Sequence, residues 1–477
     1  MIEQEPPKNA FLDTDFLTKV VGDWESSEER KNMEKAREYY LGKHNILNEG
    51  RKVKDPMAAQ SLPNHRIVDN KYCWLVDQKV NYLLGKPIVF KTEDELYAEQ
   101  LEEIFNKRFL RTFRRIGADS LNCCVGWVYP YIGKDGSLKF RKFDPVEIIP
   151  FWENSEQTDL ECVVRVFETV KNTDKTKKKE KFVEVYLPEA CTTFKSESGL
   201  IHLKTESYVT ETSGNDTKPL NWGKIPIVPF KYNPDGITLL SRVNSLQDAI
   251  NTMRSVFINH MEEDAWNTVL ILKNYDGEDL EELRGRLIRT GIVKVRTIDG
   301  EDGGIDSLEI TVNAENFEIV FRELNAAFVE NGRGYDAKRM NSGTDPNEMN
   351  LKSMYIDIDL DADMIESEYQ ASFEELLYFV NMYLQSETGA DYTKEKVDVI
   401  FNRDTIVNSN EIIQNLIALG VRLPNETLVN EIPFIDKPKD VLALLDKQDA
   451  EELKRFDNYS GGFPPASPPG KDDDDEE

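Results

Sequence analysis

The chain has 477 residues, and 59 lysine and arginine residues against 88 aspartate and glutamate residues give it a formal charge of −29 at pH 7. This acidity excludes a small basic nucleic-acid-binding module, because wrapping DNA or RNA requires a cationic surface, and it restricts any nucleic-acid contact to a local one. At ~100–200 residues per domain, this length and a hydrophobic content of 39% predict about two to four folded domains.

Five cysteines and four histidines offer little metal or disulfide chemistry. No CxxC pair occurs and the histidines are scattered, so no zinc-ligand spacing can be assembled locally. We expect reduced, mostly buried thiols of a cytosol-like compartment. The N-terminal stretch lacks the apolar core of a secretory signal, and no apolar run approaches the ~18 residues that span a bilayer. The sequence therefore predicts a protein that is neither secreted by a standard signal nor inserted in a membrane.

The N-terminal part is predicted to be helical after a short arm. Residues 1–23 are polar and contain prolines, which predicts a frayed arm. Helical spacing then runs over 24–41 and 67–84, and each of these stretches is followed by glycine, the usual residue after a helix. A further helix is expected over about 94–122.

Residues from about 120 to 235 are predicted to be mostly β structure. Short segments rich in Val, Ile, Phe and Tyr alternate there with clusters of Gly, Pro, Asn and Lys. One such cluster, at 171–181, holds six lysines. It could be a phosphate-binding patch, but a long solvated hairpin tip has the same composition, and we favour the hairpin.

From residue 241 the pattern changes to a long one-sided helix, expected over 241–264. Its apolar residues recur three or four positions apart, at Val243, Leu246, Ile250, Met253, Phe257 and Met261. A second amphipathic helix is expected over 315–331. The segment between them is predicted to be a small α/β insert, with a strand at 268–273, a charged helix at 277–291 and strands at 292–298 and 307–312.

The C-terminal part begins with a predicted flexible loop at 332–352, rich in Gly, Asn, Asp and Ser. A strong helical stretch at 366–386 is expected to start earlier, near Asn350. A strand at 397–401 and a capped helix at 411–419 follow, and the Gly/Pro-rich acidic tail from 461 is expected to be disordered.

A run of acidic residues is the most suggestive local motif. Asp357, Asp359 and Asp361 alternate, and Glu368 stands where the last ligand of an EF-hand loop would be. However, Ala362 occupies the position that needs glycine, and helix-like apolar residues surround the run. We therefore expect an acidic helical turn exposed to solvent rather than a calcium site.

No sequence motif for nucleotide or hydrolase chemistry is present. The chain lacks GxxxxGK[ST], GxGxxG after a strand, HExxH and GxSxG, so ATP, NAD and serine-hydrolase chemistry are unsupported. The one enzyme alternative is a metal-dependent nuclease that uses the acidic cluster 357–363.

Two groups of basic residues are candidate phosphate contacts. Arg284, Arg286 and Arg289 fall in the insert, and Lys338 and Arg339 fall in the predicted loop. Ordinary surface charge explains them better, because the insert as a whole is net acidic.

The order of several segments resembles a known family. They are YYLGKHNI at 39–46, NHRIVDNKYCWLVDQKVNYLLGKPIVF at 64–90, FDPVEIIPFW at 143–152 and IPIVPFKYN at 225–233. With the succession of long helix, insert, long helix, loop and long helix, they resemble the portal proteins of long-tailed double-stranded DNA bacteriophages. The stretch NKxxxLVDxKVxYLLGKPI is the most specific element, and the resemblance covers nearly the whole chain.

This resemblance implies an α+β multi-region portal fold, with a strand-rich wing, long stem helices that bracket a small α/β clip, a long wing helix and a helical crown. The expected boundaries are an N-terminal arm at 1–23, the wing at 24–240, stem helix 1 at 241–265, the clip at 266–312, stem helix 2 at 313–332, the tunnel loop at 333–352, the long wing helix at 353–387, the crown at 388–456 and a disordered acidic tail at 457–477.

The resemblance also implies the function. Such proteins form a ring, commonly of twelve subunits, at one vertex of the capsid, through which DNA is packaged and later ejected. The implied partners are other copies of the chain, double-stranded DNA, the terminase motor, head-completion or adaptor proteins, and the major capsid and scaffolding proteins, without a membrane. The implied location is the virion, and the host cytoplasm during assembly. Because the terminase supplies the energy, we expect no catalytic residue, cofactor or metal.

Candidate site residues follow from this picture. A channel that passes DNA without gripping it should be acidic or neutral, which suits the charge of −29. A few basic or polar side chains per subunit would centre the duplex, and the candidates are Lys338, Arg339, Asn341 and Lys352. Partner docking at the clip would use Arg284, Arg286 and Arg289. Mobility of the loop would come from Gly332, Gly334 and Gly343.

Overall fold

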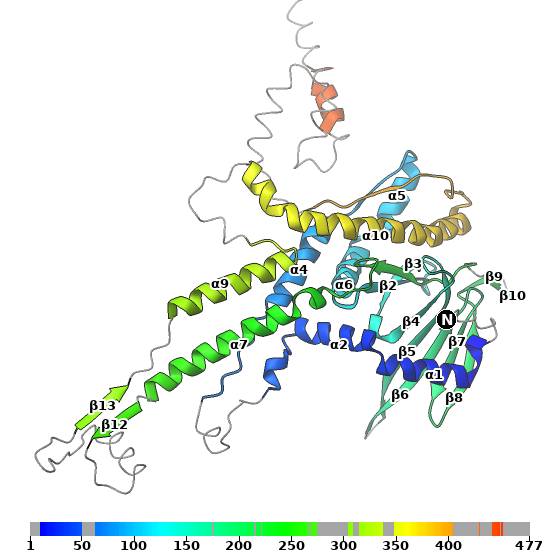
Figure 1. Ribbon diagram of the computed structural model, residues 1–477. Coiled ribbons are helices and arrows are strands. Elements are labelled where there is room, and N and C mark those ends of the chain that lie inside the picture. The colour runs from blue at the N-terminus through cyan, green and yellow to red at the C-terminus, as the bar shows by residue number, and fades with distance from the viewer. Residues whose placement is uncertain are drawn as a thin grey trace, which may run out of the picture. The chain divides into compact units, whose positions relative to one another are not determined.

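The chain divides into two compact units, of which the first holds nearly all the described elements (Figure 1). The first unit is Met1–Asp345 with Lys352–Asp404, and the second is Pro346–Leu351 with Thr405–Glu477. The computed structural model describes residues 10–49, 63–173, 176–213, 216–220, 222–266, 269–273, 304–308, 314–336, 348–403, 429, 441–448 and 450–451.

The N-terminal region is helical earlier than expected. A short 3₁₀ turn, Ala10–Leu12, precedes α1 (Thr14–Ser26), so residues 10–23 are not a frayed arm. The single helix expected over 24–41 is also wrong, because α1 ends and α2 (Glu28–Tyr40) begins at Ser27. The Ser27 hydroxyl accepts a hydrogen bond from the Arg30 amide and thereby caps α2.

Three further helices form the centre of the first unit. The helix α4 (Lys71–Leu84) begins at its cap Asn70, later than the expected residue 67. The helix expected over 94–122 is two helices, α5 (Glu95–Ile104) and α6 (Lys107–Cys123). They are separated where the Asn106 side chain accepts hydrogen bonds from the first amides of α6.

The predicted β region is confirmed between α6 and the first long helix. Its strands are β2 (Val125–Ile132), β3 (Leu138–Phe143), β4 (Ile148–Trp152), β5 (Leu160–Thr173), β6 (Thr176–Tyr186), β7 (Cys191–Ser196), β8 (Leu200–Glu206), β9 (Val209–Ser213), β10 (Asp216–Leu220) and β11 (Val228–Lys231). They form a three-stranded sheet in the order β11-β2-β3, a five-stranded antiparallel sheet β4-β5-β6-β7-β8 and a β9–β10 hairpin. The lysine-rich cluster lies where β5 and β6 pair as a hairpin, as expected.

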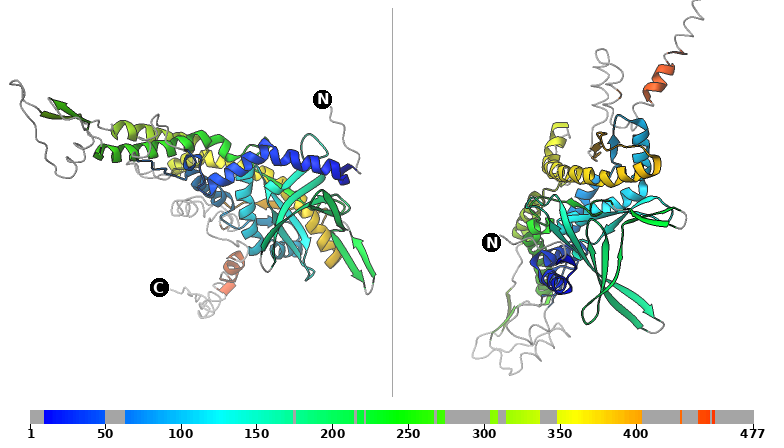
Figure 2. Two further views of the ribbon diagram at one scale, coloured as in Figure 1. Left: turned by 90° about the horizontal axis from the view of Figure 1, so that it is seen from below. Right: turned by 90° about the vertical axis from the view of Figure 1, so that its right-hand side faces the viewer.

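The two long amphipathic helices are confirmed. They are α7 (Leu239–Trp266) and α9 (Ala314–Asn331), and they lie side by side in Figures 1 and 2. The rings of Phe257 and Phe317 stack between them at a centroid distance of 4.0 Å. In the insert, β12 (Val269–Lys273) agrees with the expectation, and it pairs with β13 (Gly304–Leu308), which begins before the strand expected at 307–312. The helix and strand expected at 277–298 lie outside the described residues.

The third long helix, α10 (Glu348–Thr388), has 41 residues and is ~60 Å long at ~1.5 Å per residue. It begins within the loop expected at 332–352. After it, β14 (Asp398–Ile400) confirms the predicted strand and pairs with β1 (Val89–Lys91). Residues up to Asp404 belong to the first unit. The crown boundaries at 388–456 stay a prediction. The helix expected at 411–419 and the tail at 457–477 lie outside the described residues.

Two main cores hold the first unit together. The larger core contains a cluster of aromatic rings from α5–α6, β11 and α10, with centroid distances of 4.8–5.4 Å between neighbours Phe105, Phe109, Phe113, Phe230 and Phe373. In the second core, α1 covers one face of the five-stranded sheet. All five cysteines have free thiols. No helix in the described part of the chain is long and apolar enough to cross a bilayer.

One carboxyl group on α10 predicts a measurable pH dependence. Burial raises the pKa of Glu375 from its ordinary 4.5 to about 7, although Lys224 opposes the shift. The folded chain therefore keeps a proton that the unfolded chain releases between pH 4.5 and 7, and stability from this group falls as the pH rises through that window. We expect Glu375→Gln to match the wild type near pH 4.5 and to be more stable by about 1–3 kcal/mol at pH 8 in urea unfolding. The exposed neighbour, changed as Glu374→Gln, should show no such difference, and a benefit of Glu375→Gln that is independent of pH would contradict the assignment.

Candidate functional site

The helix α4 carries a lysine on its buried face. Its apolar residues Tyr72, Leu75, Val76 and Leu83 are buried in the larger core. Lys79 lies on this same face, only 3% exposed, at a position where helical spacing would place another apolar residue. A buried ammonium requires hydrogen bonds and a counter-charge, so this lysine marks a polar centre within the core.

The counter-charge is Asp361 on α10, whose side chain is fully buried. Lys79 Nζ donates to its Oδ2 atom over 2.7 Å, and the Tyr232 hydroxyl donates to the same oxygen over 3.2 Å. Two arginines donate to Oδ1: Arg242 from α7 over 3.0 Å, and Arg333 from the segment after α9 over 3.5 Å. This set of five residues, called the Asp361 junction below, joins α4, α7, α10 and the segment after α9.

The charges of the Asp361 junction do not balance, because three cations surround one carboxylate. Burial lowers the pKa of Lys79 to about 8, an effect that Asp361 opposes and the two arginines reinforce. Burial would raise the pKa of Asp361, but Lys79 and Arg242 outweigh it and hold that pKa below its ordinary value. The carboxylate therefore stays ionised at neutral pH and is the common partner of all three cations.

The same helix α4 also holds the segment that follows α9. The Gln78 side chain both donates to the Tyr335 carbonyl over 2.7 Å and accepts from the Tyr335 amide over 2.9 Å. Lys79 Nζ donates to the Arg333 carbonyl over 2.9 Å. A Cβ atom at Gly332 or Gly334 would lie 2.5 or 2.7 Å from the Leu75 side chain. Gly332 and Gly334 therefore permit close packing against α4, which corrects the interpretation that they provide mobility. Gly343 lies outside the described residues.

The acidic run on α10 is bound by cations rather than exposed to solvent as a whole. Arg403, beyond β14, bonds to Asp359, Asp363 and Glu366, at 3.3 Å for the first and 2.7 Å for the last. Together with the burial of Asp361, these pairs overturn the expectation of a solvent-exposed acidic turn, although Asp357 is exposed. Among the described residues no group of three or more acidic, His or Cys side chains could hold a metal ion.

A second polar feature lies along α7. Four side chains at intervals of four residues, Gln247, Asn251, Ser255 and Asn259, each accept a hydrogen bond from a main-chain amide of residues 65–72, and we call them the polar ladder. The acceptor–donor pairs are Asn259 with His65 at 2.7 Å, and Ser255 with Ile67, Asn251 with Asp69 and Gln247 with Tyr72, each at 2.9 Å.

The spacing of the polar ladder along α7 matches the spacing of the main-chain amides that it binds. Four residues of helix rise ~6.0 Å, and two residues of extended chain span ~6.6 Å, so steps of four along α7 match steps of two along 65–69. The third step is longer by one residue and reaches Tyr72 in the first turn of α4, where main-chain amides lack helical partners. Gln247 and Asn251 are fully buried, and Asn251 also contacts His44 Nδ1 at 2.8 Å.

Most of the site residues expected from the sequence are not placed by the structure. Lys338, Arg339 and Asn341, and Arg284, Arg286 and Arg289, lie outside the described residues. Lys352 belongs to α10 and not to a loop. Sequence reasoning missed the Asp361 junction and the polar ladder. The signals that could have indicated them are the lysine on the apolar face of α4 and the polar repeat every four residues on α7.

Comparison with known proteins identifies the family. The family model described as "Phage portal protein, SPP1 Gp6-like" matches residues 24–455. The chain belongs to this family of phage portal proteins. It is similar to the portal protein of Bacillus phage SPP1, with 24% identity over 454 residues that cover 92% of this chain and 86% of that protein. It is also similar to the portal protein of Clostridium phage phiCD119, with 23% identity over 450 residues, or 90% of this chain and 96% of that protein.

The match confirms the resemblance seen in the sequence and bears on the enzyme alternative. The range matched by the portal family includes both the Asp361 junction and the polar ladder. The nuclease interpretation has no support, because the relatives are portal proteins and the acids 359–366 are bound by Lys79, Arg242, Arg333 and Arg403. Portal proteins are structural components of the phage particle, and we treat the two polar features of this portal protein as structural.

Proposed function

We propose that this portal protein forms a closed ring of twelve subunits at one capsid vertex, through which double-stranded DNA enters and leaves. The family match over 24–455 carries this proposal. The long pair of α7 and α9 supports it, because both helices leave apolar side chains exposed, at Val256, Ile258, Met261, Ile319 and Val320. A ring with identical head-to-tail contacts would cover such surfaces without leaving an open edge.

Within this ring we assign the DNA contacts to the segment between α9 and α10 and to the first turns of α10. The candidates are Lys338, Arg339 and Asn341 in the segment and Lys352 in α10, on an otherwise acidic chain that would bind phosphates weakly and let DNA slide. Arg284, Arg286 and Arg289 would dock the terminase and then the head-completion proteins. The capsid and scaffolding proteins would be partners elsewhere on the ring. The Asp361 junction would hold the base of the DNA-contacting segment against α4, α7 and α10.

The mass and shape of the assembled protein test this proposal. We expect native mass spectrometry to give a species close to twelve times the 54.9 kDa of one chain, and negative-stain images of the same sample to show a central hole. The double variant Val256→Glu/Ile319→Glu should remain monomeric. Leu203→Glu, an equally exposed apolar position on β8, should still form rings. Open sheets, or rings that form equally well from the double variant, would contradict this assignment.

A further inference from the structure

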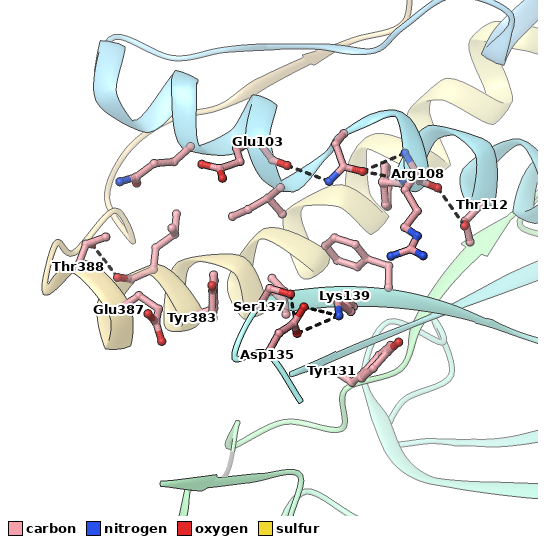
Figure 3. Close-up of a pocket in the computed structure, with 17 residues that line it drawn as sticks. Glu103, Arg108, Thr112, Tyr131, Asp135, Ser137, Lys139, Tyr383, Glu387 and Thr388 are labelled. Atoms are coloured by element: carbon pink, nitrogen blue, oxygen red, sulfur yellow. Dashed lines mark hydrogen bonds and ion pairs between the residues drawn. The ribbon is translucent and has the colours of Figure 1, made fainter. Parts of the chain in front are cut away.

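A large cavity lies in the first unit, away from the Asp361 junction and the polar ladder. Its volume is about 840 Å³, and it is formed by the end of α5 and the start of α6, the β2–β3 hairpin and the C-terminal end of α10 (Figure 3). Sites for small ligands and peptide side chains have volumes of ~300–1,000 Å³. The cavity is therefore large enough for several residues of a bound peptide.

The inner wall of the cavity is apolar and largely aromatic. Phe109, Leu138 and Leu384 line it and are less than 9% exposed, and Phe140 and Tyr131 line it as half-buried rings. An apolar side chain that covers such a surface is bound favourably, by ~25 cal/mol per Å² of apolar area removed from water. It also offers ring faces to a cation.

One end of the cavity is acidic. Figure 3 shows Glu103 from α5 and Glu387 from α10 at the same end, with Tyr383 beside them. Burial raises the pKa of the Tyr383 hydroxyl, and Glu387, Glu103 and Asp135 raise it further, so all three carboxylates act on one point of the cavity. Asp135 is bonded to Lys139 at 2.7 Å. Glu103 and Glu387 have no cationic partner among the described residues.

A neutral acceptor lies in the same cavity. The Oε1 atom of Gln100, which lines the cavity, is buried and has no hydrogen-bond partner among the described residues. A buried carbonyl oxygen without a partner costs ~1–3 kcal/mol, so this wall of the cavity carries an unsatisfied acceptor. The acidic end itself provides two carboxylates without a cationic partner among the described residues, and both can accept hydrogen bonds from a guanidinium or ammonium group.

We propose that this cavity binds a basic peptide segment of another protein. An arginine or lysine side chain of the peptide binds at the acidic end, between Glu103 and Glu387, and a neighbouring apolar side chain covers Phe109 and Leu138. Arg108, at the opposite end in Figure 3, lies where it would repel a second cation and favour an acidic or neutral residue of the peptide. Nucleic acid is excluded as the occupant, because its phosphates would meet the carboxylates. This proposal does not depend on the ring or on DNA passage.

The test uses two fluorescein-labelled hexapeptides and the full chain. One peptide has the core arginine–leucine–phenylalanine–serine, and in the other the arginine is replaced by glutamate. We expect the arginine peptide to bind with a measurable affinity in fluorescence anisotropy and the glutamate peptide not to bind. The double variant Glu103→Gln/Glu387→Gln should bind the arginine peptide roughly tenfold more weakly, as expected for the loss of two partly exposed charge pairs.

A matched control separates the cavity from the general acidity of the chain. Glu153→Gln/Glu189→Gln changes the net charge by the same amount at two exposed positions outside the cavity. This control should bind the arginine peptide as the wild type does. Equal weakening in both double variants would show non-specific attraction to an acidic protein and would overturn the proposal. Absence of binding of the arginine peptide at ~1 mM would overturn it as well.

Discussion

Asp361→Asn should destabilise the chain by about 3–5 kcal/mol in urea unfolding followed by tryptophan fluorescence. The reason is the unbalanced charge of the Asp361 junction. Asparagine keeps the shape of the side chain but leaves Lys79 and two arginines without their common anion in the core. Asp357→Asn, on the exposed side of the same helix, removes the same charge and should change stability by less than about 0.5 kcal/mol.

The effect of Lys79→Met on stability should depend on whether Asp361 is present, and this dependence distinguishes the Asp361 junction from simple packing. Lys79→Met alone should destabilise the chain by about 1–3 kcal/mol, because it removes the 2.7 Å bond while Asp361 keeps the two arginines. In the Asp361→Asn background the same change should be neutral or stabilising, since it removes an unpaired buried ammonium. Additive losses in the double mutant would show that the two side chains do not depend on each other.

Asn251→Ala should lower the free energy of unfolding by about 2–4 kcal/mol, which is the second large effect that we expect. The Asn251 side chain accepts from the Asp69 amide at 2.9 Å and from Gln247 at 3.1 Å, and it contacts His44 at 2.8 Å. Alanine would leave these buried groups without partners, each at a cost of ~1–3 kcal/mol that local rearrangement partly relieves. Hydrogen exchange should show faster exchange of the amides of residues 65–69.

The outer end of the polar ladder provides the control for this prediction. Asn259 accepts from the His65 amide at 2.7 Å, but this pair is exposed, so water can replace the lost partner. Asn259→Ala should therefore cost less than about 1 kcal/mol and speed exchange only at His65. Equal costs at both positions would mean that burial does not determine the strength of the ladder.

Periodic apolar residues predicted the long helices well. They did not predict the breaks within the stretches 24–41 and 94–122. The helices expected at 241–264 and 315–331 agree with α7 and α9 within two residues, because one apolar face of each packs on the other. Ser27 and Asn106 interrupt stretches whose periodicity continues, and their capping hydrogen bonds decide the break. Both are good capping residues, so the signal was present but weaker than the periodicity.

The partners of the acidic run could not be predicted, because they come from distant parts of the chain. Lys79 and Asp361 are 282 positions apart, and Tyr232 and Asp361 are 129 apart. A single sequence does not show which cation approaches which carboxylate, and alternating aspartates are equally compatible with a metal site or a solvated turn. The resemblance to portal proteins, which rests on whole segments, did not require such pairings and was therefore the more secure inference.

The polar ladder also has a mechanical consequence. It joins α7 to an antiparallel segment at four points along its length, so a pull along the helix axis would load these points together and not one after another. Such a connection resists shear until it yields as a whole. Pulling single molecules by tethers attached at residues 65 and 241, beyond opposite ends of the ladder, should thus give one force peak for the release of 65–72. A series of small steps would show that the bonds open singly. Strain that reached one end of α7 would then be passed along the helix without the segment beside it slipping by a turn.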